Sequence, residues 1–216
     1  KEKPTILLNS HHDTVKPNAS YTKDPFLPIV EGDVLYGLGS NDAGGPLVSL
    51  MATFEQFYYR SDLSFNLVIT ASAEEEISGK NGVEALLPEL PKIDFGIVGE
   101  PTSMVDVRVT DAYSLQDCLD IIKENVDCEV VPRSLRLNSS GIAPNHSLLK
   151  VASELGFKSY GSPTLSDQAL MPFETVKLGP GESSRSHSAD EFIKLSEIKH
   201  GIERYCQLLE TLNNRF

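Results

Sequence analysis

Histidines and acidic residues follow three short apolar runs of the sequence. The runs are Thr5–Asn9, Phe65–Thr70 and Phe95–Val98, and the residues after them include His11, Asp13, Glu75, Glu76 and Glu100. Imidazole and carboxylate groups together are the donors that bind Zn²⁺ and related divalent cations. Two further candidates lie in loops: Asp42 in the glycine-rich stretch 37–45, and His187 at the end of the stretch 179–187.

A centre with two such cations has a simple charge balance. Two Zn²⁺ ions bring four positive charges, which three ligand carboxylates and one bridging hydroxide cancel, while neutral histidines add no charge. A two-metal site generates a nucleophile near neutral pH and polarises a carbonyl oxygen. One further carboxylate that binds no metal can carry the proton. Taken together, the residue types point to metal-assisted hydrolysis.

The elements around these residues have the pattern of an α/β fold. The three apolar runs suit buried strands, and a shorter helix is predicted at 83–87. A longer helix between the first two runs has apolar residues at helical spacing, namely Leu47, Leu50, Met51, Phe54, Phe57 and Tyr58. Alternating strands and helices favour a parallel or mixed sheet with helices on its faces. Because the carboxyl ends of such strands form one crevice, we expect the scattered acids and histidines to meet there.

The segment after position 104 has a different pattern. Its predicted elements are an alternating strand at Val105–Val109, a helix opened by Ser114 and Asp117 in capping-box spacing, and a strand at Cys128–Val131. The helix carries Leu115, Leu119 and Ile122. After Pro132 the α/β pattern resumes. It continues with a helix at 148–155 that Gly156 ends, and with a last helix at 197–212.

The composition excludes several classes of function. Acidic residues outnumber basic ones 31 to 19, and the resulting net charge of −12 argues against a nucleic-acid partner, which requires a basic face. No apolar run approaches the ~20 residues that span a membrane. Three cysteines without C-x-x-C spacing disfavour a disulfide scaffold or a zinc ribbon and indicate a reducing compartment.

Other chemistries are disfavoured by what the motifs lack. The glycine-rich stretch has no Lys-Ser/Thr ending of a phosphate-binding loop, and the serines near position 185 are not in a G-x-S-x-G nucleophile turn. We expect His12, His146 and His200 to be surface or structural residues.

Taken in order, the motifs resemble one known family. Ser-His-His-Asp-Thr-Val, Gly-Leu-Gly-Ser-Asn-Asp-Ala-Gly-Gly, Ala-Glu-Glu-Glu, Gly-Glu-Pro-Thr and a late Ser-His-Ser occur in the order found in the dinuclear zinc amidohydrolases and metallopeptidases. That family includes acetylornithine deacetylase, succinyl-diaminopimelate desuccinylase, aminoacylase and carboxypeptidase G, and the resemblance is closest to the acetylornithine deacetylase branch. It implies an α/β catalytic domain, with a mixed, largely parallel sheet flanked by helices, and a partial α+β lid domain.

The resemblance implies a metal-binding role for five residues. His11 and Glu100 would bind the first zinc, and Glu76 and His187 would bind the second. Asp42 would bridge both ions, and the peptide bond after it would be cis. Zinc is the expected metal, with cobalt or manganese as substitutes.

Two more carboxylates would act without binding metal. Asp13 would hold the ring of His11. Glu75 would be the general base and acid that takes a proton from the bridging water and passes it to the leaving amine. Adjacent residues of an extended strand face opposite sides. The chain must therefore leave strand geometry near Glu75 if Glu75 and Glu76 are both to face the metals.

The implied reaction is hydrolysis of the amide bond of a small N-acylated amino acid. The branch favours N-acetyl- or N-succinyl-ornithine, in cytoplasmic arginine biosynthesis, and Ser166, Asp167 and Arg185 are candidate substrate contacts. Two alternatives stay open. One is a dipeptidase or carboxypeptidase on the same scaffold, and the other is a catalytically silent binding module.

The chain departs from the family pattern in two ways. Position 44 is Gly where the family usually has Lys. Met104 runs directly into Val105 where the family inserts the first half of its lid, and the family's N-terminal helices have no counterpart. We therefore expect a catalytic domain in two parts, 1–104 and 133–216, with a lid remnant at 105–132. A homodimer is expected for a protein with the complete lid and is doubtful without it.

Overall fold

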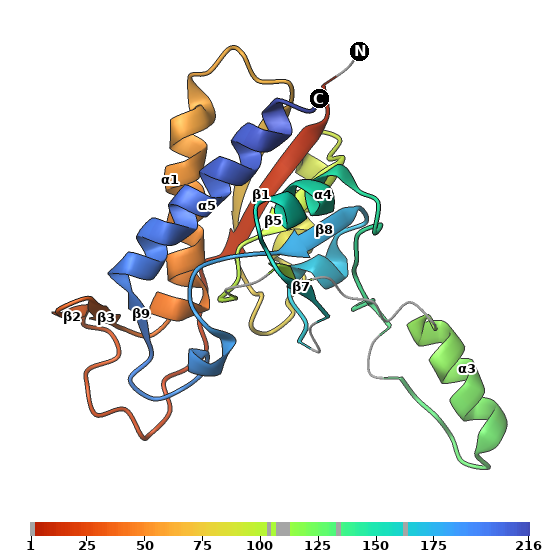
Figure 1. The fold of residues 1–216 in the computed structure, drawn as a ribbon. Helices are drawn as coiled ribbons and strands as arrows, with labels where there is room; N and C mark the ends of the chain where they lie inside the picture. The colour runs from red at the N-terminus through yellow and green to blue at the C-terminus, as the bar shows by residue number, and fades with distance from the viewer. Residues whose placement is uncertain (1–2, 103–104, 107–112, 133–134, 162–163) are drawn as a thin grey trace.

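The computed structural model describes residues 3–102, 105–106, 113–132, 135–161 and 164–216. Its larger sheet has six strands (Figure 1). Their spatial order is β4 (Asn66–Ser72), β1 (Thr5–His11), β5 (Phe95–Val98), β8 (Glu174–Lys177), β6 (Val105–Asp106) and β7 (Ser159–Tyr160). The first four strands are mutually parallel, and β6 is antiparallel to β8. The predicted α/β class with a mixed, largely parallel sheet is confirmed.

Strand β1 lies at the centre of the hydrophobic core, and all of its residues are buried. Ile6 and Leu8 face a large apolar cluster that includes residues of three helices, whereas Leu7 faces a smaller cluster on the other side of the sheet. A strand covered on both faces needs a continuous apolar run rather than an alternating one. This is why Thr5–Asn9 could be predicted as a buried strand.

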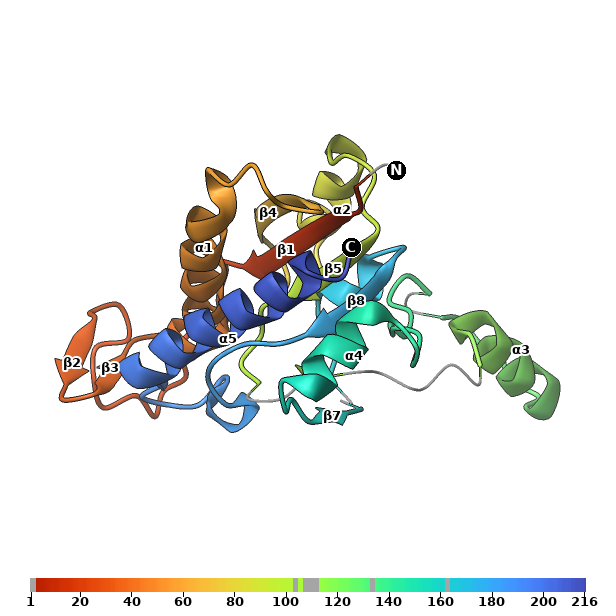
Figure 2. The same cartoon turned by 45° about the horizontal axis from the view of Figure 1, so that its top comes forward.

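Helices cover both faces of the larger sheet (Figure 2). One face carries α1 (Gly45–Tyr58), α4 (Ser147–Glu154) and α5 (Leu195–Asn213). The other carries α2 (Val83–Leu86) and the short turns η2 (Leu87–Glu89) and η3 (Asp167–Leu170). The predicted helices at 83–87, 148–155 and 197–212 are confirmed to within two residues at each end, and Gly156 follows α4 with φ 77°. Among the described residues, no helix has the length and apolar character needed to cross a membrane.

The buried face of α1 differs from the predicted one. Leu50 and Phe57 are buried as expected, but Met51 and Tyr58 are exposed. Ser49 and Thr53 are buried instead. The reason is that α1 packs against α5 as well as against the sheet. Ser49 lies at that contact, because its hydroxyl is 3.4 Å from the carbonyl oxygen of Ile198.

A second, three-stranded antiparallel sheet was not predicted. It consists of β2 (Ile29–Glu31), β3 (Val34–Tyr36) and β9 (Phe192–Lys194), with β3 in the middle. Its strands are three residues long and only partly buried, so they lack the continuous apolar run that marks the core strands. The sheet matters for the site because β3 leads into the loop of Asp42, and β9 follows the loop of His187.

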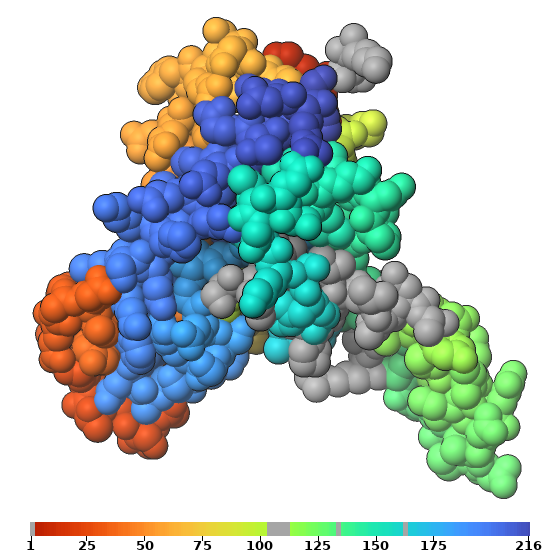
Figure 3. Space-filling view, viewed as in Figure 1, coloured from red at the N-terminus to blue at the C-terminus, as the bar shows by residue number. Residues whose placement is uncertain are grey.

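Helix α3 (Leu115–Asn125) stands away from the rest of the molecule (Figure 3). The predicted capping box is confirmed: the hydroxyl of Ser114 accepts from the N–H of Asp117, and the carboxylate of Asp117 accepts from the N–H of Ser114. Of the apolar residues on this helix, Leu119 is buried, whereas Ile122 is 49 % exposed. An amphipathic helix buries its apolar residues only where another element covers them.

The strands predicted on either side of α3 differ from the observed ones. Cys128–Val131 is not a strand in the structure. Because Val131 is largely exposed, this segment lacks the cover that would stabilise a lone strand. Val105–Asp106 is a strand, but it pairs with β7 and β8 of the larger sheet. Val107–Val109 and the junction at Met104 lie outside the described residues, and the domain boundaries remain a prediction.

Candidate metal centre

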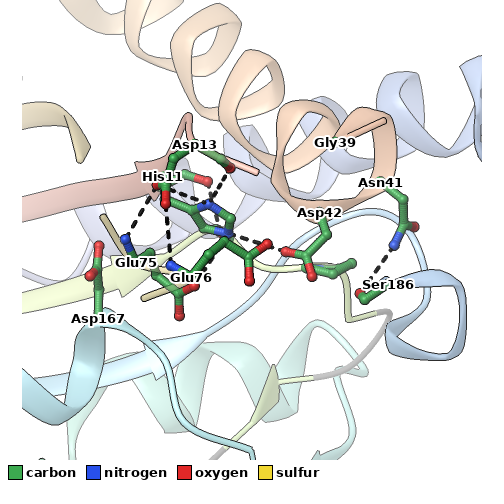
Figure 4. A network of polar contacts seen from close by, with 12 residues as sticks. His11, Asp13, Gly39, Asn41, Asp42, Glu75, Glu76, Asp167 and Ser186 are labelled. Carbon is green, nitrogen blue, oxygen red and sulfur yellow. Dashed lines mark hydrogen bonds and ion pairs between the residues drawn. The ribbon is translucent and has the colours of Figure 1, made fainter. Parts of the chain in front are cut away.

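The carboxyl ends of three parallel strands meet at one edge of the larger sheet, and His11, Glu75 and Glu76 lie there (Figure 4). His11 is the last residue of β1, Glu75 and Glu76 follow β4, and Glu100 follows β5. Because β1 pairs in parallel with both β4 and β5, the carboxyl ends of the three strands lie next to one another. The segments are far apart in the chain but adjacent in space.

His11 is 1 % exposed, and each of its ring nitrogens faces a different group. Nδ1 lies 3.0 Å from the main-chain oxygen of Asp13 and 3.6 Å from the Asp13 carboxylate. Nε2 points into the cluster, 3.1 Å from Oδ1 of Asp42. An Nδ1–H that donates to a main-chain oxygen leaves Nε2 as the ring's free acceptor, which is the form that binds a metal.

Asp13 also holds the two glutamates that follow β4. Its carboxylate accepts the N–H groups of Glu75 at 3.3 Å and Glu76 at 3.2 Å. Just before them, Glu74 has φ 58°, so the chain has left strand geometry, as predicted. The Glu74 carboxylate closes the following loop by accepting from the N–H and side chain of Asn81. Glu75 and Glu76 therefore face the same cluster, as Figure 4 shows.

Asp42 lies between the two predicted histidines. It belongs to the irregular turn η1 (Ser40–Gly44), and the peptide bond between Asp42 and Ala43 is cis, as predicted. Its Oδ1 is 3.1 Å from Nε2 of His11, and its Oδ2 is 3.6 Å from Nε2 of His187. One carboxylate thus contacts both sides of the cluster, which is the arrangement a bridging ligand requires.

His187 completes the cluster from a loop on the far side. It follows the turn η4 (Ser183–Arg185), has φ 59°, and places Nε2 2.9 Å from Oε2 of Glu76. Its side chain is 54 % exposed, whereas those of Asp42 and Glu76 are largely buried. The cluster is therefore open to solvent on the His187 side.

Three overlapping groups of side chains present ligand atoms within 4.8 Å of one another. They are His11, Asp42 and Glu100; Asp42, Glu76 and His187; and His11, Glu75 and Glu76. Asp42 belongs to the first two, so the five predicted ligands form two sets that share one carboxylate. In addition, Oε1 of Glu76 is buried without a hydrogen-bond partner among the described residues. A buried oxygen that lacks a donor fits a cation.

Crowding of carboxylates shapes the electrostatics of the cluster. Burial, together with the charges of Asp167, Glu76 and Asp42, raises the pKa of Glu75 to about 7, although His11 opposes the rise. Burial also raises the pKa of Glu76 and of Glu100. Such shifts mean that negative charge here lacks compensation, which a bound cation would supply. A carboxyl with a pKa near 7 suits proton transfer near neutral pH.

For His11 and Asp42, which are hydrogen-bonded to each other, the effect of burial on the pKa is outweighed by their mutual interaction and by neighbouring charges. Burial lowers the pKa of His11, but the hydrogen bond to Asp42 and the charges of Glu100 and Glu75 outweigh it and raise the pKa to about 10. Burial raises the pKa of Asp42, but the hydrogen bond and charge of His11 outweigh it, so that this pKa is lowered.

The predicted substrate contacts are engaged elsewhere. Ser166 is buried and accepts from the N–H of Gln168 at the start of η3. Asp167 is 3 % exposed and accepts hydrogen bonds from Asn9 of β1 and Ser72 of β4. Arg185 binds the carboxylate of Glu197 with two nitrogens, at 2.7 and 2.9 Å. The substrate contact predicted for these three residues stays a prediction.

The remaining histidines lie outside the cluster, in agreement with the prediction. His12 and His200 are exposed. His146 caps α4, because its Nδ1 accepts the N–H of Leu148. Glu191, a buried acid whose carboxylate accepts a hydrogen bond from the loop of Asp42, was not among the predicted site residues. The only feature of the sequence that pointed to a role for Glu191 near the site was its position, four residues after His187 and directly before the apolar pair Phe192–Ile193. This feature is a weak predictor.

Curated proteins similar to this chain are named as desuccinylases. Succinyl-diaminopimelate desuccinylase of Nitrosococcus oceani is 34 % identical over 111 residues, which is 48 % of this chain and 30 % of that protein. The enzyme of the same name from Halorhodospira halophila is 32 % identical over 121 residues, covering 53 % of this chain and 32 % of that protein. The aligned region thus spans about a third of the length of these relatives.

Solved structures share the fold over almost the whole chain. The M20 family metallo-carboxypeptidase Sso-CP2 from Sulfolobus solfataricus has a TM-score of 0.66 at 12 % identity, covering 96 % of this chain and 85 % of that one. The Bacillus subtilis protein YXEP, described as a dinuclear metal-binding peptidase, has a TM-score of 0.59 at 13 % identity, covering 100 % and 83 %. The model of peptidase family M20/M25/M40 matches residues 7–211. With this match over most of its length, the chain belongs to the peptidase family M20/M25/M40.

Proposed function

We propose that this protein is a metal-dependent amidohydrolase that cleaves the amide bond of an N-acylated amino acid. The observation that carries the proposal is the position of Asp42, whose two carboxylate oxygens lie 3.1 Å from Nε2 of His11 and 3.6 Å from Nε2 of His187. Two donor sets from separate segments of the chain thus share one carboxylate. This geometry is what a two-metal hydrolytic site needs.

The residues divide between the two ions as follows. His11 and Glu100 would hold one metal, Glu76 and His187 would hold the other, and Asp42 would be shared by both. The mixed imidazole and carboxylate set suits Zn²⁺, with Co²⁺ or Mn²⁺ as substitutes. When bound, the ions would activate a water molecule and polarise the scissile carbonyl group. The unpartnered Oε1 of Glu76 supports the fit, since a metal would satisfy it.

Glu75 is placed to move the proton. Its Oε2 lies 3.9 Å from Nε2 of His11, so its carboxylate reaches the cluster but is absent from both sets that contain Asp42. The N–H of Glu75 donates a hydrogen bond to the carboxylate of Asp13, which positions the main chain from which the Glu75 side chain extends. We assign Glu75 the uptake of a proton from the attacking water and its delivery to the leaving amine.

The substrate proposed is a small N-acyl amino acid. The names of the curated relatives favour an N-succinyl group on a diamino acid. N-acetyl- and N-succinyl-ornithine, predicted from the motifs, belong to the same chemical class and remain candidates. The dipeptidase and carboxypeptidase alternatives use the same bond type and the same metal cluster.

The test is an assay of the purified protein after reconstitution with Zn²⁺ or Co²⁺. The substrates are N-succinyl-diaminopimelate, N-acetyl-ornithine, N-succinyl-ornithine and a dipeptide, with bound metal measured in the same samples. We expect hydrolysis of at least one N-acyl amino acid with kcat/KM above that of the dipeptide. Preference for the dipeptide would favour a peptidase. Two metals bound with no turnover of any substrate would favour the silent binding module.

Two further proposals concern the setting of the enzyme. Cys118 and Cys128 are exposed free thiols, which supports a reducing compartment such as the cytoplasm. The homodimer stays a prediction tied to a complete lid, and light scattering of the purified protein measures it.

A further inference from the structure

Glu191 is almost completely buried, with 1 % of its surface exposed. Glutamate side chains are rarely buried to this extent. Within the described residues, no lysine, arginine or histidine lies within ion-pair distance of its carboxylate. Instead the carboxylate accepts three main-chain N–H groups of one loop. Oε1 accepts from Asn41 at 3.0 Å and from Asp42 at 2.8 Å, and Oε2 accepts from Gly39 at 3.0 Å.

These three N–H groups belong to the loop that carries the shared carboxylate. Gly39 has φ 73°, and Asp42 and Ala43 are not helical, so a regular helix does not satisfy the N–H groups before α1. The main chain of Glu191 holds the start of the same loop, because its carbonyl oxygen accepts the N–H of Gly37 at 3.0 Å. Glu191 therefore binds both ends of the segment 37–42.

The same residue is tied to the loop of His187. Glu191 lies four positions after His187 and directly precedes β9, which pairs with β3. The chain from β3 runs straight into the loop of Asp42. A second link joins the two loops, because the amide of buried Asn41 accepts from the N–H of Glu182 and donates to its carbonyl oxygen, both at 3.1 Å. The polar contacts thus join the two loops that supply Asp42 and His187.

We propose that Glu191 is a positioning residue for Asp42, the carboxylate that both donor sets share. Its carboxylate fixes the main chain at Gly39, Asn41 and Asp42, so that the Asp42 side chain lies between the two histidines. The inference rests on the proposed function, because it assumes that these side chains bind metal. Removing an outer partner that orients a ligand typically costs 10- to 100-fold in metal affinity.

The chemistry of the contact predicts which substitutions matter. In Glu191→Gln, the amide oxygen can still accept from Asn41 and Asp42, but the NH₂ group would face the N–H of Gly39. One hydrogen bond of three is lost, and two donors are opposed. In Glu191→Ala, all three N–H groups lose their acceptor, and buried donors without partners destabilise a fold. The glutamine variant therefore tests positioning, and the alanine variant gives the upper limit.

The experiment measures Zn²⁺ and Co²⁺ affinity by titration of the metal-free protein, together with hydrogen exchange of the amides at 39–42. The matched control is Asp33→Asn, because Asp33 accepts the N–H and hydroxyl of Ser196 at the other end of the small sheet. Because Asp42 belongs to both donor sets, we expect Glu191→Gln to weaken the binding of both metals 10- to 100-fold and to speed exchange at 39–42. Exchange in the core strands should stay at wild-type values, as should the metal affinity and exchange of the control. In a metal-loaded assay, kcat should fall with little change in KM.

Wild-type affinity of both metals and unchanged exchange in Glu191→Gln would overturn the proposal. Weaker metal binding together with faster exchange throughout the core and a general loss of folding would also overturn it, since that is the signature of a purely structural residue. Failure of the proposed function looks different: the wild-type protein would bind two metals and hydrolyse no substrate, while the affinity difference between wild type and Glu191→Gln would still be measurable. If Glu191→Ala does not fold, Glu191→Gln alone decides the outcome.

Discussion

The two halves of the metal cluster are built in different ways. One half consists of His11, Glu75, Glu76 and Glu100, which come from the ends of parallel strands in the buried sheet. The other half consists of Asp42 and His187, which come from loops beside a small, partly exposed sheet. The strand-built half is positioned by register and core packing. The loop-built half is positioned by polar contacts through Glu191 and Asn41.

This difference shows how each half can fail. Strand ends move only if the core moves, so damage to the strand-built half should appear as lost global stability. A loop held by a few hydrogen bonds can shift while the core stays folded. Damage to the loop-built half should therefore appear as lost metal affinity with smaller effects on unfolding.

Substitutions of the neighbours Glu75 and Glu76 should affect different properties of the strand-built half: the first the catalytic rate, the second the binding of metal. Glu75→Gln removes the proposed proton carrier, so we expect kcat to fall about 10²- to 10⁴-fold while metal content stays near that of the wild type. Glu76→Gln should instead weaken one metal. Steady-state kinetics and metal analysis of both variants check this. Identical behaviour of the two would show that the division of roles is wrong.

A cavity beneath the strand-built half should reduce global stability. Leu8 is fully buried in β1, and Leu8→Ala should cost about 2–5 kcal/mol of unfolding free energy. Ile122→Ala on exposed α3 is the control and should stay within about 0.5 kcal/mol of the wild type. Urea denaturation measures both. A loss at Ile122 as large as that at Leu8 would mean that α3 is packed in solution.

The buried carboxylate of Asp167 tests whether the strand-built half also needs polar support. Asp167→Ala leaves the side chains of Asn9 and Ser72 without their common acceptor, which should cost about 1–3 kcal/mol. Asp167→Asn keeps one acceptor and should cost less. Because Asp167 is buried, KM should change little in either variant. A tenfold rise in KM at wild-type stability would instead establish the substrate contact predicted from the sequence.

The smallest expected effect concerns Arg185, which anchors the turn before His187 to α5 through Glu197. Arg185→Lys keeps the charge but loses the two-point contact, so we expect a loss of about 0.5–1.5 kcal/mol. Zn²⁺ affinity should fall slightly and KM should not change. Thermal unfolding, metal titration and kinetics of this variant check the prediction. A large rise in KM with unchanged stability would contradict the structural role.

Much of the fold was predictable because its strongest signals are local. The apolar runs Thr5–Asn9 and Phe95–Val98 mark strands that are buried on both faces, and the capping box at Ser114 marks the start of a helix. The small sheet escaped prediction because its strands are short and half-exposed. Cys128–Val131 has the residue types of a strand, but pairing requires a partner and a cover, which this segment lacks.

The residues that could bind metal were predictable from the sequence. The buried residues that position them were not. Histidines and acids after strands are visible in the sequence, and the motifs that resemble a known family located His187 and the cis peptide after Asp42. The buried roles of Glu191 and Asp167 were not visible, since most glutamates and aspartates are exposed. Whether a carboxylate faces solvent or three main-chain N–H groups depends on contacts between residues about 150 positions apart.

The amino-acid sequence by itself determined which residues can bind cations and which apolar runs become strands, because residue chemistry and local periodicity need no partner. Only the tertiary structure decided that Asp42 lies between His11 and His187, that Glu191 holds its loop, and that Arg185 faces α5. The physical reason is distance along the chain. Hydrogen bonds and ion pairs act over a few ångströms, so their partners are set only once the sheet has brought remote segments together.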